Sequence, residues 1–101
     1  RKTVAEIRAS HEFDSSCAGS IPPALAAFLE STSFEDAVRT AVSIGGDADT
    51  MASIAGALAE AFYGGVPEKI AADTLARLDD RLRGVIARFR EAYPAQHTVQ
   101  A

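Results

Sequence analysis

The chain has 101 residues, of which 48% are hydrophobic and 24% charged, with a formal net charge of −4 and a sequence pI near 5.0. This composition is typical of one small globular domain spanning residues 1–101 and argues against extensive disorder. The negative charge disfavours a phosphate-binding surface, and no apolar run approaches the length of a membrane-spanning helix, so we expect neither a nucleic-acid partner nor a membrane. The single cysteine excludes an intrachain disulfide and is compatible with the cytoplasmic location that we expect.

The first thirty residues predict two helices separated by a polar segment. Apolar residues at helical spacing predict a short helix, or the end of a longer one, within residues 1–10. The next ten residues are mostly small and polar, and they end in Ser20, a suitable N-cap for a helix with Pro22 and Pro23 in its first turn. We expect this second helix to run to about Ser31.

The start of this second helix has two possible roles. Free backbone amides and the positive end of the helix dipole favour phosphate oxygens there, whereas ordinary capping by Ser20 accounts for the same residues. In the preceding loop, His11 has the side chain for acid–base chemistry, but a lone loop histidine is more often solvated. Cys17 has no partner base that the sequence identifies, so we expect a small packed residue there.

The middle of the chain predicts two further helices. Ser33 and Asp36 resemble a capping box before apolar residues at helical spacing, which predicts a helix from about Phe34 to Ile44. A second apolar stripe predicts a helix from Thr50 to Tyr63 with a single charged residue. We therefore expect this helix to be buried on most sides, and Gly56 within it to lie against a closely crossing helix.

The last third of the chain predicts one kinked helix or two. A Gly-Gly pair ends the preceding helix, and Pro67 begins a helical pattern that resumes after Asp79 and Asp80 and ends at Pro94. Charges of both signs alternate along this part, which is typical of a solvated, ion-paired helical surface. Because no segment of the chain shows strand-like alternation, the predicted fold class is all-α, a compact multi-helix bundle.

Carboxylates and a hydroxyl group converge at residues 44–50, between two helical patterns. The two glycines in this segment allow a tight turn. Asp47 and Asp49 can face one ion only if the helix has not begun at Asp47, so we expect Asp49 at or beside the N-cap and Thr50 opening the helix. Oxygen ligands favour hard cations such as Mg²⁺, Mn²⁺ or Ca²⁺. Capping and the helix dipole explain an acidic helix start equally well, so both interpretations stay open.

The sequence Gly-Gly-Asp-Ala-Asp-Thr at residues 45–50, with the apolar segment that follows it, resembles the C-terminal metal motif of the ADP-ribosylglycohydrolase family. Residues 13–25, 28–29 and 78–82 also resemble that family, which includes the ADP-ribosyl-dinitrogen-reductase hydrolases. The resemblance implies an all-helical hydrolase with two Mg²⁺ or Mn²⁺ ions that removes ADP-ribose from a modified side chain or an ADP-ribose derivative.

Specific site residues follow from the same resemblance. Asp47, Asp49 and Thr50 match the family's C-terminal metal ligands, with Asp49 the best candidate to bridge both ions. The loop before the second helix is the expected position of the ADP-ribose diphosphate. The candidate substrate-binding residues there are Ser16, Gly19 and Ser20.

This chain also departs from the family. Members are longer and carry further ligands near their N-terminus, including a Thr-Asp-Asp type cluster that no segment here supplies. We therefore expect the C-terminal portion of a larger protein or a processed product, which holds half of a metal site and needs the remaining N-terminal part as its partner. By itself it should release little ADP-ribose, and it should either be less stable than the full chain or self-associate. Asp79 and Asp80 could approach the same ions.

The alternative function is that of a non-catalytic relative or fragment with a structural or ligand-binding role, since the resemblance extends to jellyfish lens crystallins. The linkage that would be cleaved, and the catalytic base, are left open by the sequence.

Overall fold

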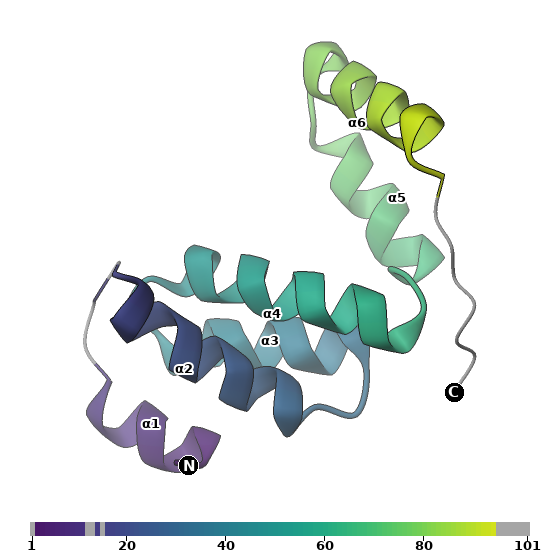
Figure 1. Ribbon diagram of the computed structural model, residues 1–101. Helices are drawn as coiled ribbons and strands as arrows, with labels where there is room; N and C mark the ends of the chain where they lie inside the picture. The colour runs from purple at the N-terminus through teal and green to yellow at the C-terminus, as the bar shows by residue number, and fades with distance from the viewer. Residues whose placement is uncertain (1, 12–13, 15, 95–101) are drawn as a thin grey trace.

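Helices account for nearly all of the secondary structure. The computed structural model describes residues 2–11, 14 and 16–94 of the chain. It contains the helices α1 (Val4–Ser10), α2 (Cys17–Leu29), α3 (Phe34–Ile44), α4 (Ala48–Tyr63), α5 (Glu68–Ala76) and α6 (Asp80–Ala92) (Figure 1). No strand occurs in these residues, so the all-α prediction is confirmed. Within the same ranges, no helix combines the length and apolar character needed to cross a membrane.

The first four helices form a bundle. α3 and α4 pack most extensively against each other, α2 lies against both, and α1 contacts α2 and α3 (Figure 1). α2 and α4 begin at the same end of this bundle, where α3 ends. Alanine dominates the core, which lets the helix axes approach closely; the buried apolar residues are Val4, Ala24, Ala26, Ala27, Ala37, Ala41, Ile44, Met51, Ala55 and Ala59.

α4 is the central helix, as the sequence predicts, but it is not covered on most sides. One face is buried, whereas Ser53, Ala57 and Ala61 are exposed. The expected close crossing is present at Gly56, where an added Cβ would lie 3.5 Å from the Val38 Cγ2 atom of α3. That is ordinary van der Waals contact, so Gly56 marks a close approach that still has room for a methyl group.

The chain leaves the bundle at the predicted Gly-Gly pair. Gly64 takes a left-handed conformation, with φ 84° and ψ 25°, and the amides of Gly64 and Gly65 both donate to the Glu60 carbonyl oxygen. α5 and α6, here called the arm, project from the bundle (Figure 1) and bury none of their residues. The two helices of the arm are separate, which resolves the choice between one kinked helix and two.

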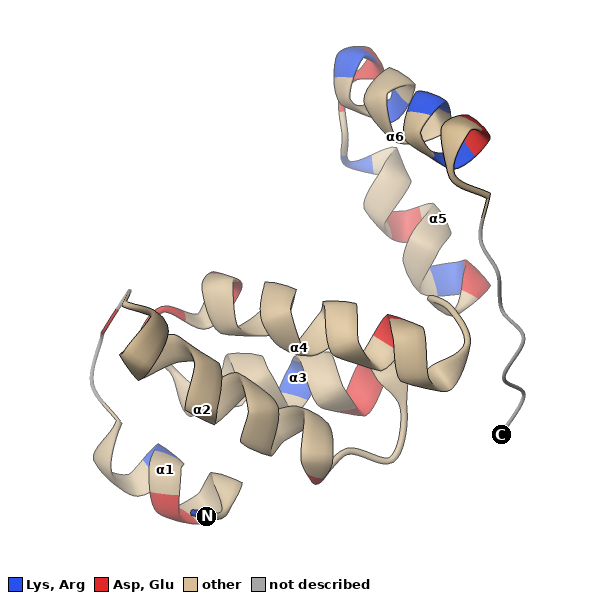
Figure 2. Ribbon diagram, in the orientation of Figure 1, with Lys and Arg blue, Asp and Glu red and all other residues tan. Residues whose placement is uncertain are grey.

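The charged residues of the arm carry both signs and are exposed, which confirms the predicted solvated surface (Figure 2). Asp79 caps α6 by accepting a hydrogen bond from the Leu82 amide at 2.8 Å. Arg83 pairs with Asp80 at 2.6 Å and donates to the carbonyl oxygens of Leu75, at 3.0 Å, and of Leu78. These bonds fix the corner between α5 and α6, and they give Asp79 and Asp80 structural partners within the arm.

The predicted start of α2 was wrong. Ser16, not Ser20, is the N-cap, because its hydroxyl oxygen accepts a hydrogen bond from the Gly19 amide at 3.1 Å. Asp14 holds Ser16 in that position by accepting from both its amide, at 2.9 Å, and its hydroxyl, at 2.6 Å. The helix therefore begins at Cys17, and the two prolines lie inside it rather than in its first turn.

Two single-residue predictions near this turn were also wrong. Cys17 is exposed rather than packed, because it is the first residue of α2 and lies at the end of the bundle. His11, the C-cap residue of α1, is only partly exposed rather than solvated. Its Nε2 atom is buried and has no hydrogen-bond partner among the described residues.

Candidate metal centre

The loop between α3 and α4 depends on two consecutive glycines with positive φ. Gly45 has φ 88° and ψ −165°, and Gly46 has φ 69°. The first combination lies in a region that is essentially restricted to glycine, whereas the left-handed φ of Gly46 is one that asparagine also reaches. The tight turn that the two glycines allow is thus present, and both of them have a positive φ. No atom lies within 4 Å of a Cβ added at Gly45, so the restriction there comes from the backbone alone.

The loop delivers Asp47 to the N-cap position of α4. Its φ of −81° and ψ of 65° are not helical, which confirms the requirement that the helix has not begun at this residue. The helix begins at Ala48, so the expectation that Asp49 would lie at or beside the cap and that Thr50 would open the helix is off by two residues. Asp49 is instead the second residue of the helix.

The three predicted metal ligands lie together at the start of α4, but they are held differently. Asp47 is partly exposed, and its side chain makes no capping hydrogen bond. Asp49 is exposed, and its Oδ1 atom accepts from the Thr50 amide at 3.0 Å. Because the Asp47 carboxylate is not used by the helix, capping gives no account of why an aspartate stands there.

Two carboxylates and a hydroxyl are only part of a coordination sphere. Mg²⁺ takes six oxygen ligands, often including several waters. Among residues 2–11, 14 and 16–94, no group of three or more His, Cys, Asp or Glu side chains is placed to hold a metal ion. Asp47, Asp49 and Thr50 therefore fit a hard cation in the chemistry of their donor atoms, but they require further ligands.

The predicted substrate-binding residues lie at the start of α2, at the same end of the bundle as the start of α4 (Figure 1). Ser16 is the N-cap, and Gly19 donates its amide to that cap. Ser20 is 2% exposed, and its hydroxyl donates to the Asp14 carbonyl oxygen at 3.0 Å. Each residue has a structural role, and their contact with a substrate stays a prediction.

Comparison with known families decides which protein family this is. The family model described as ADP-ribosylglycohydrolase matches residues 1–98. The chain belongs to the ADP-ribosylglycohydrolase family. Separate comparisons with curated proteins and with solved structures give no match. The resemblance identified from the Gly-Gly-Asp-Ala-Asp-Thr motif is thus confirmed, and the family is one of hydrolases.

Sequence reasoning missed Asp14, whose side chain holds the start of α2. Hydrogen bonds from the Ser16 hydroxyl and the Ser16 amide lower the pKa of the Asp14 carboxyl, and the nearby His11 adds to that effect. An added Cβ at Gly19 would lie 2.1 Å from the Asp14 Cγ atom, so the glycine is what lets the carboxylate fold over the helix start. The Asp-Ser-Ser sequence before α2 was the available signal, since Asp and Ser side chains commonly form such turns.

Proposed function

We propose that the chain forms part of a metal-dependent hydrolase that removes ADP-ribose from a modified protein side chain or from an ADP-ribose derivative. In this proposal Asp47, Asp49 and Thr50 supply three oxygen ligands to a site for two Mg²⁺ or Mn²⁺ ions. The remaining ligands come from outside the described residues. The observation that carries the proposal is the uncapped Asp47 carboxylate at the end of a glycine-dependent loop, in a chain of the ADP-ribosylglycohydrolase family.

In this proposal the start of α4 stabilises and orients the carboxylates that would bind the ions. Asp47 and Asp49 both lie in the first turn or cap of α4, where the positive end of the helix dipole stabilises carboxylates. The Thr50 amide fixes one oxygen of Asp49, which leaves its second oxygen for an ion. When bound, divalent cations supply charge stabilisation and an activated water for cleavage at an anomeric carbon.

The start of α2 is the proposed position of the ADP-ribose diphosphate. Its backbone amides and dipole favour phosphate oxygens, and it lies at the same end of the bundle as the candidate metal ligands. Ser16 is the N-cap of that helix and Gly19 is its third residue, whereas the buried Ser20 hydroxyl donates to the Asp14 carbonyl oxygen in the preceding turn. This arrangement would let the ions act on the ribose while the helix start holds the diphosphate.

Calorimetric titration with Mn²⁺ tests the metal assignment. We expect Asp47→Asn and Asp49→Asn each to weaken Mn²⁺ binding at least tenfold, since each removes a formal negative charge from a hard-cation site. Glu60→Gln is the matched control, because it removes an exposed carboxylate from the far end of the same helix. Equal affinity in all three variants would show that neither aspartate is a metal ligand.

A non-catalytic role is the second candidate, because the described residues hold only a partial set of ligands. A family member with that role would bind ADP-ribose without releasing it from a substrate. Measuring ADP-ribose binding and ADP-ribose release side by side, with and without Mn²⁺, separates the two. Metal-dependent release supports the hydrolase, and metal-independent binding without release supports the alternative.

A further inference from the structure

The short helix α1 is joined to the other helices at both of its ends. At its N-terminal end, the Val4 amide donates to the Oε2 atom of Glu30, the C-cap residue of α2, at 2.8 Å. At its C-terminal end, the Arg8 guanidinium donates to the Ser43 hydroxyl of α3 at 2.6 Å. These two hydrogen bonds fix α1 relative to α2 and α3.

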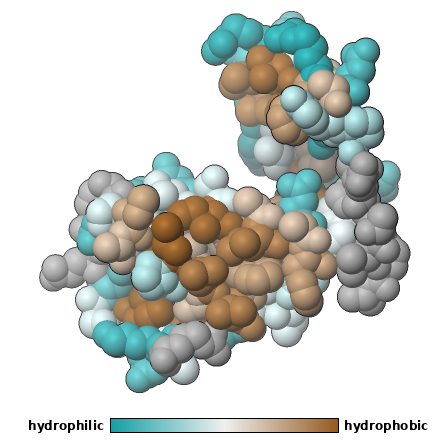
Figure 3. All heavy atoms as spheres, viewed as in Figure 1, coloured by the Kyte–Doolittle hydropathy of each residue, from teal (hydrophilic) through white to brown (hydrophobic). Residues whose placement is uncertain are grey.

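The inner side of α1 belongs to the core that borders residues 45–50, here called the metal loop. Val4 and the partly buried Ile7 pack in the same apolar cluster as Ile44 and Met51. Ile44 directly precedes the metal loop and Met51 directly follows it. Figure 3 shows hydrophilic side chains at the outer edge of α1. The helix therefore shares a core with both ends of the metal loop.

The hydrogen bond between Arg8 and Ser43 holds the last turn of α3, from which the metal loop departs. The Ser43 hydroxyl donates its own hydrogen to the Thr40 carbonyl oxygen at 2.7 Å, so the same oxygen accepts from Arg8 while it is bonded within α3. The C-terminal end of a helix favours a cation. The last turn of α3 has no basic residue of its own, and Arg8 of α1 supplies that charge.

A movement of this turn would be passed on to the candidate metal ligands. Only Gly45 and Gly46 separate α3 from Asp47, and both glycines have a positive φ. The ends of helices fray, whereas the ligands of a metal site must be held within about 0.5 Å of their working positions. Holding the last turn of α3 in place therefore limits the displacement of the Asp47 carboxylate.

We propose that Arg8 and Ser43 are positioning residues for the metal centre, because their hydrogen bond holds the last turn of α3 and, through the metal loop, the Asp47 carboxylate. The inference rests on the proposed function. Arg8 has two effects on a bound cation, and their signs are opposite. Its positive charge repels the cation, so the loss of charge alone would strengthen binding, whereas the loss of positioning weakens it.

Calorimetric titration of the chain with Mn²⁺ tests these roles. We expect Ser43→Ala, which leaves every charge in place, and Arg8→Met each to weaken Mn²⁺ binding about three- to tenfold, the range that one hydrogen bond typically contributes. The double variant should bind like Arg8→Met, because both substitutions remove the same hydrogen bond. Ser43→Thr keeps the hydroxyl and should bind like the parent. Both side chains are exposed, so the helical circular dichroism should be unchanged in every variant.

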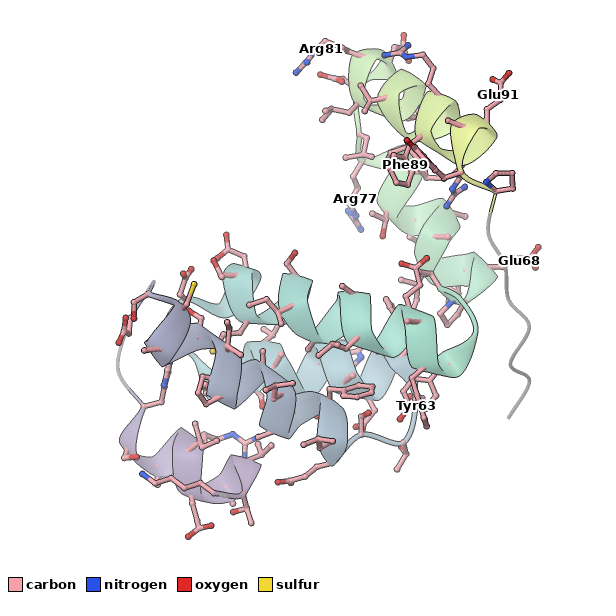
Figure 4. All side chains as sticks on the ribbon, viewed as in Figure 1. Tyr63, Glu68, Arg77, Arg81, Phe89 and Glu91 are labelled. Carbon is pink, nitrogen blue, oxygen red and sulfur yellow. The ribbon has the colours of Figure 1, made fainter. Side chains whose placement is uncertain are left out.

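Tyr63→Phe is the matched control, because it also removes a hydroxyl hydrogen bond between distant parts of the chain. The Tyr63 hydroxyl donates to the Ser31 carbonyl oxygen at 2.9 Å. Figure 4 shows Tyr63 at the opposite end of α4 from the metal loop. This variant should unfold at a lower urea concentration than the parent but bind Mn²⁺ with the same affinity, which separates positioning from a general loss of stability.

Asp47→Asn in the same titrations distinguishes a failure of this inference from a failure of the proposed function. If Asp47→Asn weakens binding while Ser43→Ala binds like the parent, or while Arg8→Met binds more tightly, only the positioning role is wrong. That role is also wrong if Tyr63→Phe weakens binding as much as Ser43→Ala does. If Asp47→Asn itself binds like the parent, the proposed metal centre fails and the positioning role fails with it.

Discussion

Replacing Gly45 by alanine tests the strain on which the metal loop depends. At φ 88° and ψ −165°, Gly45 occupies a region that alanine reaches only at a cost of order 1–3 kcal/mol. The site itself offers no steric obstacle, since nothing lies within 4 Å of the added Cβ. The free energy of unfolding should therefore fall by about 1–3 kcal/mol, or the loop should change its conformation to escape the strain.

Gly56→Ala is the matched control for this substitution. It adds the same methyl group to a glycine within a helix, 3.5 Å from Val38, where the backbone favours alanine by about 1 kcal/mol. Urea unfolding followed by circular dichroism should show a loss of stability for Gly45→Ala and none, or a gain, for Gly56→Ala. Gly46→Asn should cost less than Gly45→Ala, because asparagine tolerates a left-handed φ of 69°. If Gly45→Ala unfolds at the same urea concentration as the parent and keeps its Mn²⁺ affinity, the strained-loop reasoning is wrong.

Three further predictions concern the bundle. Gly19→Ala should displace the Asp14 carboxyl group, whose Cγ atom would otherwise lie 2.1 Å from the new Cβ. NMR titration should then show the pKa of Asp14 rising to its ordinary range. An unchanged pKa would contradict the predicted steric clash between the new methyl group and Asp14. Hydrogen bonds from Ser16 lower the folded-state pKa of Asp14. The stability that these bonds contribute is therefore fully present above the unfolded-state pKa of about 3.9 and should be lost as the pH falls through the lower folded-state pKa. This dependence of stability on acid pH should be smaller in Asp14→Asn. Tyr63→Phe should lower the free energy of unfolding by about 1 kcal/mol, because the Tyr63 hydroxyl donates to the Ser31 carbonyl oxygen at 2.9 Å, and a thermal melt that matches the parent would show that the bond adds nothing.

Helix boundaries were predictable where a side chain caps the backbone in the expected way. The predicted helix from Phe34 to Ile44 coincides with α3, because Ser33 accepts from the Asp36 amide at 3.0 Å. Asp36 does not close the reciprocal half of the capping box; its carboxylate accepts from the Thr32 amide instead. The spacing of Ser33 and Asp36 therefore predicted the correct start of α3, even though the Asp36 carboxylate accepts from the Thr32 amide and not from the Ser33 amide of a complete capping box.

The boundaries that failed depend on backbone angles and on local side-chain turns. α4 begins at Ala48, two residues before the predicted start at Thr50, because Asp47 is the N-cap through its backbone conformation and without a side-chain hydrogen bond. α2 begins before its predicted start because Asp14 and Ser16 form a hydrogen-bonded turn that caps the helix. The small polar residues of this segment predict only a loop when they are judged by composition. Periodicity also identified the helical pattern of α6, but a periodic pattern says only which side of a helix is apolar. It cannot say whether that side is covered, which is why the exposed surfaces emerged only from the structure.

The candidate ligands were predictable because their chemistry is local to six consecutive residues. Asp47, Asp49 and Thr50 lie in one turn, and the non-helical backbone of Asp47 meets the condition for its side chain to face the same ion as Asp49. Ligands contributed by distant parts of a chain have no such sequence signal, and the described residues supply no further cluster. The sequence therefore predicts where an ion would bind, whereas the completeness of the site depends on residues beyond this turn.

Paramagnetic broadening by Mn²⁺ in an ¹H–¹⁵N NMR spectrum tests the central claim most directly, because it locates a bound ion on the chain without requiring activity. At the lowest Mn²⁺ concentrations, the amide signals of residues 45–51 should broaden first, while those around the exposed carboxylates of Glu68 and Asp80 on the arm should stay sharp. In Asp47→Asn the preference for residues 45–51 should disappear. Broadening that follows all exposed carboxylates equally, or that is unchanged in Asp47→Asn, would contradict a metal centre at the start of α4.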